Sequence, residues 1–394
     1  MNSPPSVLYS AFDVVPSPKG ASTHITYFTR GLVEAGYRVQ LITAGDPSLP
    51  ERDTYCGASI LRVPVGDDLN FLRRAVEFGQ TVMRHVESSP PYDVCHFRSV
   101  WCGLPIVQAG PRLGYRTLFE VNGLPSVELK YHYPALKGNP LLSKIKEQEI
   151  ATLLLADTII CPSAVTRAYI ASLARSVPRD KITVIPNGVD TKLFTPQPLN
   201  PRSDLPTILY IGTLADWQGL DVLIEAMPAI LAQYPVRLRI VGRGRGRQRK
   251  DLQKRIRKLG LEGSISIEPA SPHHEMPALI AQADVCVAPL AYNDRNVTQG
   301  CCPIKVIEYM ACARPVVTSN LPVVREMARD DADALLFTPD EPADLARCVL
   351  AILNDASLAQ RLADSAAKRA QIKFSWHEAQ KRLVRVYEQL IRDA

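Results

Sequence analysis

Short runs of β-branched and other apolar residues alternate along the chain with longer segments whose apolar residues recur at helical spacing. In the first half the extended runs lie at 6–12, 39–44, 60–65, 93–97, 116–121, 158–163 and 181–186. Helical patterns fall between several of them, for example at 21–35 and 69–87. Strands separated by helices in this way are typical of a parallel, doubly wound sheet. The first half therefore predicts one α/β domain.

The alternation stops near residue 190 and then restarts. Four prolines interrupt FTPQPLNPRSDLPT, a composition that is typical of a linker. Strand patterns then recur at 207–212, 236–242, 264–269, 284–290 and 315–320, with helical patterns at 219–233, 247–259, 275–282 and 303–312. Three helical stretches follow from about 341 to 392. We predict Rossmann-like domains over 1–190 and 207–372, a linker over 191–206, and a C-terminal helix over 373–394 that crosses back to the first domain.

The predicted topology also indicates where function should lie. In doubly wound sheets, ligands bind outside the carboxyl ends of the strands, in the loops that lead into the helices. We therefore expect the two sheets to face one another across a cleft that is lined by these loops.

Composition narrows the class of protein. The 394 residues are 46% hydrophobic and 22% charged, which excludes a wholly disordered or collagenous chain. Nine cysteines show neither a C-x-x-C pair nor metal-ligand spacing, and the N-terminus lacks a basic-then-apolar leader. These features predict a reducing, cytoplasmic location. The longest apolar stretches are too short to span a bilayer, so any membrane contact is expected to be peripheral.

The strongest local signal is the segment QGCCPIKVIEYMACARPVVTSN, which begins at Gln299 and reads as a loop, a helix, a tight turn and a buried strand. Pro303 suits a first helical turn, because its missing amide hydrogen would be unpaired there in any case. The backbone amide of Ile304 and the ammonium of Lys305 would favour a phosphate at this helix end. Glu308, about one turn further on, can accept hydrogen bonds from a ribose diol. A surface helix with a solvated lysine and glutamate is the alternative.

A second signal is the alternation of glycine and arginine after the strand at 236–242. Gly242, Gly244 and Gly246 let a backbone approach a phosphate closely, although such a pattern alone is weakly specific. The text continues as RQRKDLQKRIRK, which places a cluster of Lys and Arg on one predicted helix and its entry loop. A solvated helix face explains it most simply, and attraction to anionic lipid comes second. Nucleic-acid binding ranks last, because no aromatic residue lies between Tyr234 and Tyr292 for base stacking.

Four stretches in this order and spacing resemble the retaining glycosyltransferases of family four. They are TVIPNGVDTKLFTP, ILYIGTLADWQGLDVLIEA, RLRIVGRGRGRQRKDL and CPIKVIEYMACARPVVTS. The resemblance covers nearly the whole chain and is densest from about 180 to 320. It implies the GT-B fold, a C-terminal domain that binds a nucleotide-sugar, an N-terminal domain that binds the acceptor, and transfer without a divalent metal or other cofactor.

Carried over residue by residue, the resemblance makes Glu308 the residue that holds the donor ribose. An earlier family glutamate falls on Gly300, and two family cations fall on Thr213 and Gln218. Lys305, Arg243 and Arg245 are the candidate replacements for the missing positive charge, and we assign catalytic roles to Lys305, Arg243 and Glu308. The expected donor-binding set is Gly212, Thr213, Gly219, Gly242, Arg243, Gly244, Arg245, Pro269, Ala270, Ser271, Pro303, Ile304, Lys305 and Glu308.

The N-terminal half supplies the expected acceptor site. The loop after the first strand retains half of a glycine pair that is usual in the family, and Arg98 and Asn122 follow two later strands. Arg98 can bind an acidic acceptor in two-pronged fashion, with a structural ion pair as the alternative. Asn122 stands where many relatives carry a histidine that contacts the transferred sugar. The expected acceptor-binding set is Lys19, Gly20, Ala21, Arg98 and Asn122.

Three further acidic or basic side chains near these positions are expected to play structural parts. His24 is expected on a helix surface, and Glu120 and Glu128 are expected to face solvent or to form ion pairs.

Metal binding is not expected. Asp331 and Asp333 have the spacing of a D-x-D site, but they precede a late strand and are explained more simply by an acidic turn. Cys301 and Cys302 are adjacent and lack further ligands at zinc spacing.

Two functions of different classes remain open. The first is a retaining transferase that moves a hexose from a UDP- or GDP-linked donor to a hydroxyl acceptor by front-face return, without an enzyme nucleophile. The second is a catalytically silent module of the same fold that binds a nucleotide-sugar or a protein, suggested by the departures at Gly300, Thr213, Gln218 and Asn122. A dehydrogenase is weaker, because neither domain opens with a G-x-G-x-x-G turn. The acceptor stays open between saccharides, lipid-linked sugars and small metabolites.

Overall fold

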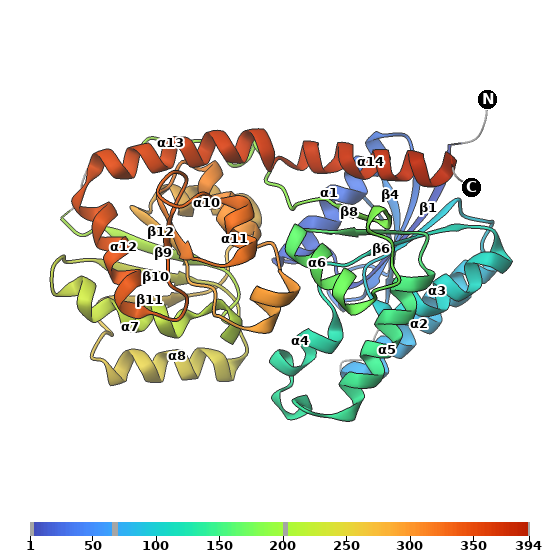
Figure 1. Ribbon diagram of the computed structural model, residues 1–394, viewed down its shortest axis with the longest axis horizontal. Coiled ribbons are helices and arrows are strands. Elements are labelled where there is room, and N and C mark those ends of the chain that lie inside the picture. Colours follow the sequence, from blue (N-terminus) through green and yellow to red (C-terminus); the bar gives the residue numbers. More distant parts are fainter. Residues whose placement is uncertain (1–3, 65–69, 200–203, 393–394) are drawn as a thin grey trace. The chain divides into compact units, whose positions relative to one another are not determined.

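A computed structural model describes residues 4–64, 70–199 and 204–392, and these form two compact units (Figure 1). The first unit comprises Met1–Pro186 with His377–Ala394, and the second comprises Asn187–Trp376. The chain therefore enters the second unit before the proline-rich segment 191–206. Described residues of that segment pack with the second unit, since Leu199 lies against its core and Gln197 and Pro198 bind Arg314 through their carbonyl oxygens.

The first unit is built on an eight-stranded sheet with the order β3-β4-β2-β1-β5-β6-β7-β8. Its strands are β1 (Ser6–Val14), β2 (Arg38–Ala44), β3 (Arg52–Tyr55), β4 (Ala58–Val63), β5 (Val94–Phe97), β6 (Arg116–Glu120), β7 (Thr158–Cys161) and β8 (Ile182–Val184). Every pairing is parallel except that of β3 with β4. The doubly wound α/β fold is therefore confirmed.

The β3–β4 pairing is the exception to the parallel pattern expected from the sequence. The text RDTY of β3 has no apolar alternation, and three of its four residues are exposed. Such a strand gives no periodic signal, and it lies at the edge of the sheet, where one face and one side remain in water. The strand expected at 60–65 begins at Ala58 and ends at Val63, and residue 65 lies outside the described residues.

Helices cover the first sheet on both faces. They are α1 (Gly20–Glu34), α2 (Phe71–Ser88), α3 (Val100–Leu113), α4 (Pro125–His132), α5 (Pro140–Leu155), α6 (Ala164–Leu173) and α14 (Trp376–Arg392). The side chains of α14 join this unit, because Gln380 donates to the carbonyl oxygen of Tyr27 at 2.7 Å and the Tyr387 hydroxyl lies 2.8 Å from His96 Nδ1. The core between the layers consists of residues such as Leu8, Phe78, Phe97 and Phe119.

The second unit has a six-stranded parallel sheet with the order β11-β10-β9-β12-β13-β14. Its strands are β9 (Thr207–Ile211), β10 (Arg237–Val241), β11 (Ile265–Glu268), β12 (Val285–Ala288), β13 (Val316–Ser319) and β14 (Leu335–Phe337). Its helices are α7 (Leu220–Leu231), α8 (Gly246–Lys258), α9 (Met276–Ala281), α10 (Ile304–Ala311), α11 (Pro322–Met327), α12 (Pro342–Asn354) and α13 (Ala356–Lys373). None of the described helices is long and apolar enough to cross a membrane.

Both sheets reverse their strand order at an internal point. In the first unit the order turns between β1 and β5, and in the second between β9 and β12. The loops that follow these paired strands diverge to opposite faces of the sheet and leave room for a ligand between them. The fold thus provides one candidate binding edge in each unit.

Candidate functional site

In the second unit, the turning point between β9 and β12 gathers most of the expected donor residues at one edge. Gly212–Gly219 follows β9, and the glycine-arginine loop follows β10. Pro269–Ser271 follows β11, and the segment that leads into α10 follows β12. We call this set of loops, together with the first turn of α10, the donor edge.

Lys305 turns its ammonium group toward the end of β9. Its Nζ donates to the Tyr210 hydroxyl at 2.8 Å and to Gln218 Oε1 at 2.6 Å, and it lies 4.1 Å from the centre of the Tyr210 ring. Burial lowers the pKa of Lys305 to about 7, although the charge of Glu308 acts in the opposite direction. Both hydrogen-bond partners that the structure describes for the Lys305 ammonium are neutral. An arriving anion would therefore meet a positive charge that no hydrogen-bonded carboxylate compensates.

The two departures at Thr213 and Gln218 meet at the same place. Gln218 Nε2 donates to Thr213 Oγ1 at 3.5 Å while its Oε1 binds Lys305. The positions where the family often has cations therefore surround the one lysine that the chain retains there. Gln218, which the sequence marked only as a loss, supports Lys305 directly.

Glu308 lies one turn further along α10 and is paired with a histidine from the loop after β11. Its Oε1 lies 3.0 Å from His273 Nε2, and its side chain is 13% exposed. The His273 ring in turn lies 5.2 Å from the Phe194 ring. One carboxylate oxygen is thus oriented by His273, an arrangement that suits recognition of two neighbouring hydroxyl groups.

The glycines of the donor edge are explained by how closely its loops pack. A Cβ atom on Gly242 would lie 1.7 Å from the Gly212 carbonyl oxygen, and one on Gly219 would lie 1.9 Å from the Pro289 carbonyl oxygen. A Cβ on Gly244 would lie 2.6 Å from Leu214 Cβ, whereas one on Gly246 would meet nothing within 4 Å. The sequence interpretation, close approach to a phosphate, is therefore not needed for Gly242 and Gly244. Their absent side chains let the β9 and β10 loops touch.

For the remaining expected donor residues, the structure gives mainly their exposure and their position in the loops. Arg243 and Arg245 are exposed, and the Arg243 carbonyl oxygen accepts from the Leu214 amide at 2.9 Å. Pro269 is exposed, while Ala270 and Ser271 are half-buried. Pro303 directly precedes α10, as the sequence predicted, and Ile304 is its first residue.

A π-helical turn, Arg295–Gln299, connects β12 to the donor helix and was not predicted. It ends at Gly300, whose φ of 76° is left-handed. Asn296 is buried and donates from Nδ2 to the carbonyl oxygens of Trp217 and Ala291, both at 2.8 Å. The turn is thereby tied to the loop after β9. Gly300, where the family carries a glutamate, fills a backbone role at which a side chain would add strain.

Asn187 is another residue whose part the sequence did not reveal. It is 7% exposed, and its Nδ2 donates to the Cys302 carbonyl oxygen at 2.9 Å. It therefore fixes the loop that enters α10. The N-G pair in IPNGVD was a visible signal for a tight connection, but its partner lies far along the chain.

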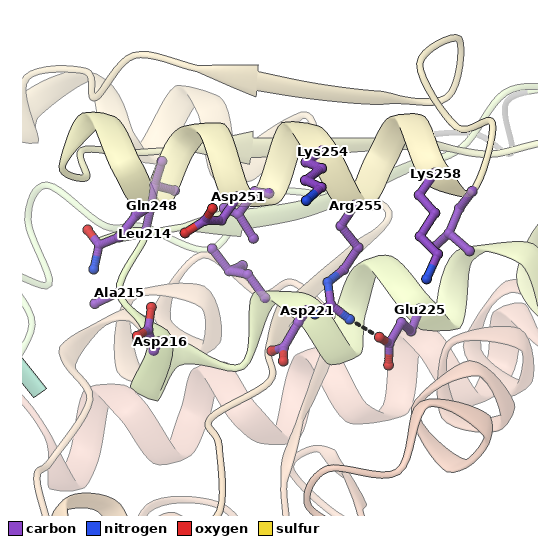
Figure 2. Close-up of a pocket in the computed structure, with 13 residues that line it drawn as sticks. Leu214, Ala215, Asp216, Asp221, Glu225, Gln248, Asp251, Lys254, Arg255 and Lys258 are labelled. Carbon is purple, nitrogen blue, oxygen red and sulfur yellow. Dashed lines mark hydrogen bonds and ion pairs between the residues drawn. The ribbon is translucent and has the colours of Figure 1, made fainter. Parts of the chain in front are cut away.

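A separate pocket, with a volume of about 580 Å³, lies between α7 and α8, and Figure 2 shows the residues that line it. It is lined by Leu214, Ala215, Asp216, Leu220, Asp221, Glu225, Gln248, Asp251, Leu252, Lys254, Arg255, Lys258 and Leu259. Acidic side chains of α7 face basic ones of α8, and Arg255 forms an ion pair with Glu225. None of the expected donor residues lines it, and its acidic side chains, Asp216, Asp221, Glu225 and Asp251, outnumber its three basic ones. We therefore do not place the donor there.

In the first unit, the turning point between β1 and β5 is occupied by a buried carboxylate. Glu120, at the end of β6, is 2% exposed. Its Oε1 lies 2.9 Å from both His24 Nε2 and Arg98 Nε, and it also accepts from Asn122 Nδ2. Its Oε2 accepts from the Tyr9 hydroxyl at 2.8 Å and lies 3.0 Å from His96 Nε2. We call these residues the Glu120 cluster.

The charges of the cluster compensate one another. Burial alone would raise the pKa of Glu120, but the charges of Arg98 and His24 and the hydrogen bonds from both histidines hold it well below its usual range. Burial lowers the pKa of His96. Burial also acts to lower the pKa of Arg98, but the negative charge of Glu120, with those of Asp13 and Glu128, outweighs it and raises that pKa. Glu120 is therefore ionised and Arg98 is its counter-ion.

The structure corrects one expectation about this edge and contains the alternative that was given for another. His24 was expected on a helix surface, but it is 3% exposed and points into the cluster, because α1 turns that face toward the end of β6. Arg98 was expected to be available to an acidic acceptor, with an ion pair as the alternative. It is 7% exposed, it pairs with Glu120, and its Nη1 lies 3.8 Å from Asp13 Oδ2. The ion pair is what the structure contains.

The other expected acceptor residues lie at the start of α1 and after β6. Lys19 and Gly20 are exposed, and the Ala21 carbonyl oxygen accepts from Arg98 Nη1 at 3.2 Å. Asn122 is half-buried and belongs to the cluster. Lys19, Ala21, Arg98 and Asn122 are thus brought to one edge of the first sheet, which we call the acceptor edge.

The remaining acidic and sulfur-containing candidates have structural contacts. Asp333 is fully buried and pairs with Arg329 at 2.8 Å and with Arg369 at 3.5 Å. Asp331 pairs with Arg361 at 2.9 Å. Cys301 Sγ lies 3.4 Å from Arg295 Nη2, and Cys302 is buried. In the part of the chain that the structure describes, no group of three or more metal-binding side chains is found.

Comparison with known proteins agrees with this architecture. The profile of the family described as Glycosyl transferases group 1 matches residues 205–355, and that of Glycosyltransferase Family 4 matches residues 18–193. An uncharacterized glycosyltransferase from Methanocaldococcus jannaschii is 25% identical over 94% of each chain. A D-inositol 3-phosphate glycosyltransferase from Xylanimonas cellulosilytica is also 25% identical, over 94% of this chain and 91% of its own.

Solved structures show the same fold. Sucrose-phosphate synthase from Thermosynechococcus elongatus superimposes with a TM-score of 0.84 at 22% identity, covering 99% of this chain and all of its own. HepE from Anabaena in complex with UDP-glucose gives a TM-score of 0.74 at 17% identity, covering 98% of this chain and 99% of its own. The two profiles together span both units, and with the two binding edges described above they show that the chain belongs to glycosyltransferase family four and has the GT-B fold.

Proposed function

We propose that the protein is a retaining hexosyltransferase that moves a hexose from a UDP- or GDP-linked donor to a hydroxyl acceptor, without a metal ion or other cofactor. The donor edge of the second unit binds the nucleotide-sugar, and the acceptor edge of the first unit binds the acceptor. The observation that carries the proposal is the pair Lys305 and Glu308, one turn apart at the N-terminal end of α10.

The donor edge suits a nucleotide diphosphate. The positive end of α10 and the Lys305 ammonium favour the diphosphate, and the Glu308 carboxylate suits the ribose hydroxyl groups. Because Lys305 has only neutral hydrogen-bond partners, a diphosphate would raise its pKa from about 7 and fix its proton. Arg243 and Arg245 are exposed beside the same loop and can add positive charge from solvent.

The proposed reaction needs no nucleophile from the enzyme. The bond between the anomeric carbon and the diphosphate oxygen breaks, and Lys305 stabilises the negative charge that develops on the departing diphosphate. The acceptor oxygen then bonds to the anomeric carbon from the same side. Its proton passes to a phosphate oxygen of the leaving group, so the configuration is retained and all charges balance.

Names of similar proteins support the class of donor and product. HepE has been crystallised with UDP and with UDP-glucose, and other similar chains are named for transfer to an inositol phosphate or for synthesis of sucrose phosphate. The UDP-glucose bound to HepE supports a nucleotide-linked hexose donor. The names of the other proteins point to different acceptors, so they do not select one for this chain.

The test is consumption of UDP- and GDP-linked hexoses in the presence of a panel of sugars, polyols and lipid-linked saccharides. We expect turnover with one donor. Lys305→Met should lower kcat/KM by about 100-fold to 1,000-fold, the usual cost of removing one group that stabilises developing negative charge. Lys368→Met, which removes an exposed lysine of α13, is the matched control and should leave turnover unchanged.

A catalytically silent binding module is the second candidate, and the departures at Gly300, Thr213, Gln218 and Asn122 favour it. It predicts that a nucleotide-sugar binds and that Glu308→Ala abolishes binding, while no acceptor and no water consumes the donor. Slow hydrolysis of the donor that depends on Lys305 would be enough to reject it.

We also propose that the protein acts in the cytoplasm and contacts the inner face of the membrane through α8. No disulfide joins any of the nine cysteines, all of which lie in the described part of the chain, as expected in a reducing compartment. The exposed cations of α8 are Arg247, Lys250, Lys254, Arg257 and Lys258. Each contributes about 1 kcal/mol near an anionic surface. At low salt, the wild-type protein should sediment with vesicles that contain phosphatidylserine. A Lys250→Glu, Lys254→Glu, Arg257→Glu triple variant should stay in the supernatant. Equal sedimentation of both would refute this contact.

A further inference from the structure

We propose that Glu120 makes the acceptor edge selective for acceptors that present neutral hydroxyl groups, because it takes up the charge of Arg98 and fixes Asn122 as a hydrogen-bond acceptor. The proposal rests on the proposed function and names the class of acceptor. It concerns the edge at which the sequence suggested that Arg98 binds an acidic acceptor.

The first step of the argument is the position of Arg98. Its Nε lies 2.9 Å from Glu120 Oε1, its Nη1 donates to the Ala21 carbonyl oxygen at 3.2 Å, and Asp13 Oδ2 lies 3.8 Å away. With 7% of the side chain exposed, the guanidinium lies buried against the Glu120 carboxylate, which disfavours the two-pronged binding of a phosphate or carboxylate from solvent. A second anion beside it would also meet the carboxylates that already surround it.

The second step is the orientation of Asn122. Its amide lies against Glu120 Oε1, and an ionised carboxylate can only accept hydrogen bonds. The atom next to Glu120 must therefore be Nδ2, and Oδ1 lies on the other side of the amide group. Asn122 is half-buried, and in this proposal its Oδ1 accepts a hydrogen bond from an acceptor hydroxyl.

The third step is the charge of the edge. Asp13, whose side chain is 34% exposed, stands at the end of β1, and Glu128 lies close enough to Arg98 to act on its charge. Together with Glu120 these groups supply three carboxylates, against the guanidinium of Arg98 and the imidazole of His24. The edge therefore offers oxygens that accept from hydroxyl groups and repels a phosphate placed beside the reacting oxygen. Lys19 acts against this selectivity, because it is exposed at the start of α1 and can bind an anion there.

The cluster is held in place from the far end of the chain. His96 Nε2 lies 3.0 Å from Glu120 Oε2, and the other ring nitrogen, Nδ1, lies 2.8 Å from the Tyr387 hydroxyl. The ring of His96 also stacks on Tyr9 with 4.2 Å between centroids. Tyr387 thus supports the same carboxylate without touching Arg98 or Asn122, and it offers a matched control.

The first experiment titrates the intact protein, labelled in its arginine side chains, with inorganic phosphate and follows the Arg98 Nε resonance by NMR. Arg98→Lys identifies the signal. We expect no phosphate-dependent shift in the wild type or in Tyr387→Phe, and a saturable shift in Glu120→Gln, where the guanidinium loses the carboxylate that compensates its charge. A merely structural role for Glu120 predicts that Tyr387→Phe and Glu120→Gln behave alike. A saturable shift of Arg98 in the wild type would overturn the proposal.

The second experiment measures transfer to glucose, fructose and myo-inositol, each beside its monophosphate. We expect the wild type to favour the neutral member of each pair, and Glu120→Gln to raise the KM for that member by about tenfold or more with little change in donor KM. Preference for the phosphorylated member that is lost in Lys19→Gln would contradict the proposal. If no donor binds at all, the proposed function fails, while the phosphate titration still judges Glu120 because it needs no donor.

Discussion

The donor edge and the acceptor edge occupy equivalent places in two sheets of the same kind, but they are built with opposite charge. At the donor edge, the two hydrogen-bond partners that the structure describes for the Lys305 ammonium are neutral. At the acceptor edge, Arg98 is surrounded by Asp13, Glu120 and Glu128. A cation with neutral neighbours is available to an incoming diphosphate, whereas a cation that is already paired positions other groups. On the proposed function, the same fold would therefore serve different ligands at its two edges through the partners that it gives to one basic residue in each.

The largest effect should follow from breaking the ion pair of the acceptor edge. Glu120→Ala would leave Arg98 buried without its main counter-ion, and we expect the free energy of unfolding to fall by about 3–5 kcal/mol. Urea denaturation of wild type and variant measures this. Glu77→Gln, at an exposed ion pair on α2, should change stability by less than about 1 kcal/mol. Equal losses in both variants would show that the Glu120 cluster is no more than a surface pair.

A comparable but local effect is expected at the donor edge, where loop packing rather than charge is decisive. Gly219 has a φ of 66°, and a Cβ there would lie 1.9 Å from the Pro289 carbonyl oxygen. Gly219→Ala should therefore cost about 3 kcal/mol from strain and overlap together. Gly246→Ala is the matched control, because a Cβ there meets nothing within 4 Å, and it should leave stability unchanged or raise it by about 0.5 kcal/mol. Thermal denaturation distinguishes them, and similar losses would contradict the packing account.

The fold was largely predictable because buried parallel strands produce continuous apolar runs. Strands such as 207–211 and 285–288 are buried throughout and were expected within a residue or two. The exposed edge strand Arg52–Tyr55 was missed because its pattern depends on pairing with β4 and not on burial.

Residues of the candidate sites could be predicted only where they lie close together in the sequence. Pro303, Lys305 and Glu308 share one helix end, so their spacing was informative. His24 and Arg98 both contact Glu120, which comes from another strand. His273 orients Glu308, which lies on α10. Such contacts across the fold leave no local pattern in the chain.

A smaller effect sharpens the electrostatic difference between the edges. Burial lowers the pKa of Lys305 to about 7, and a bound diphosphate should raise it again. Below that pH the lysine is already protonated and affinity should be flat. Above it, binding must take up a proton, so the dissociation constant of a nucleotide-sugar should rise by up to about tenfold per pH unit. Calorimetric titration between about pH 6 and about pH 8 measures this. The Lys305→Met variant should show weaker binding without the slope, and a persisting slope would assign the proton to another group.

The most direct test of the account is a calorimetric titration of UDP and GDP into wild type and Glu308→Gln at neutral pH. The account predicts that one nucleotide binds the wild type, and that the variant binds it at least about tenfold more weakly, because an amide at this position has one accepting oxygen where the carboxylate has two. His273→Gln, which removes only the partner of Glu308, should give an intermediate loss. Equal affinity in wild type and Glu308→Gln, or no binding of either nucleotide, would contradict the placement of the donor at the edge of the second unit.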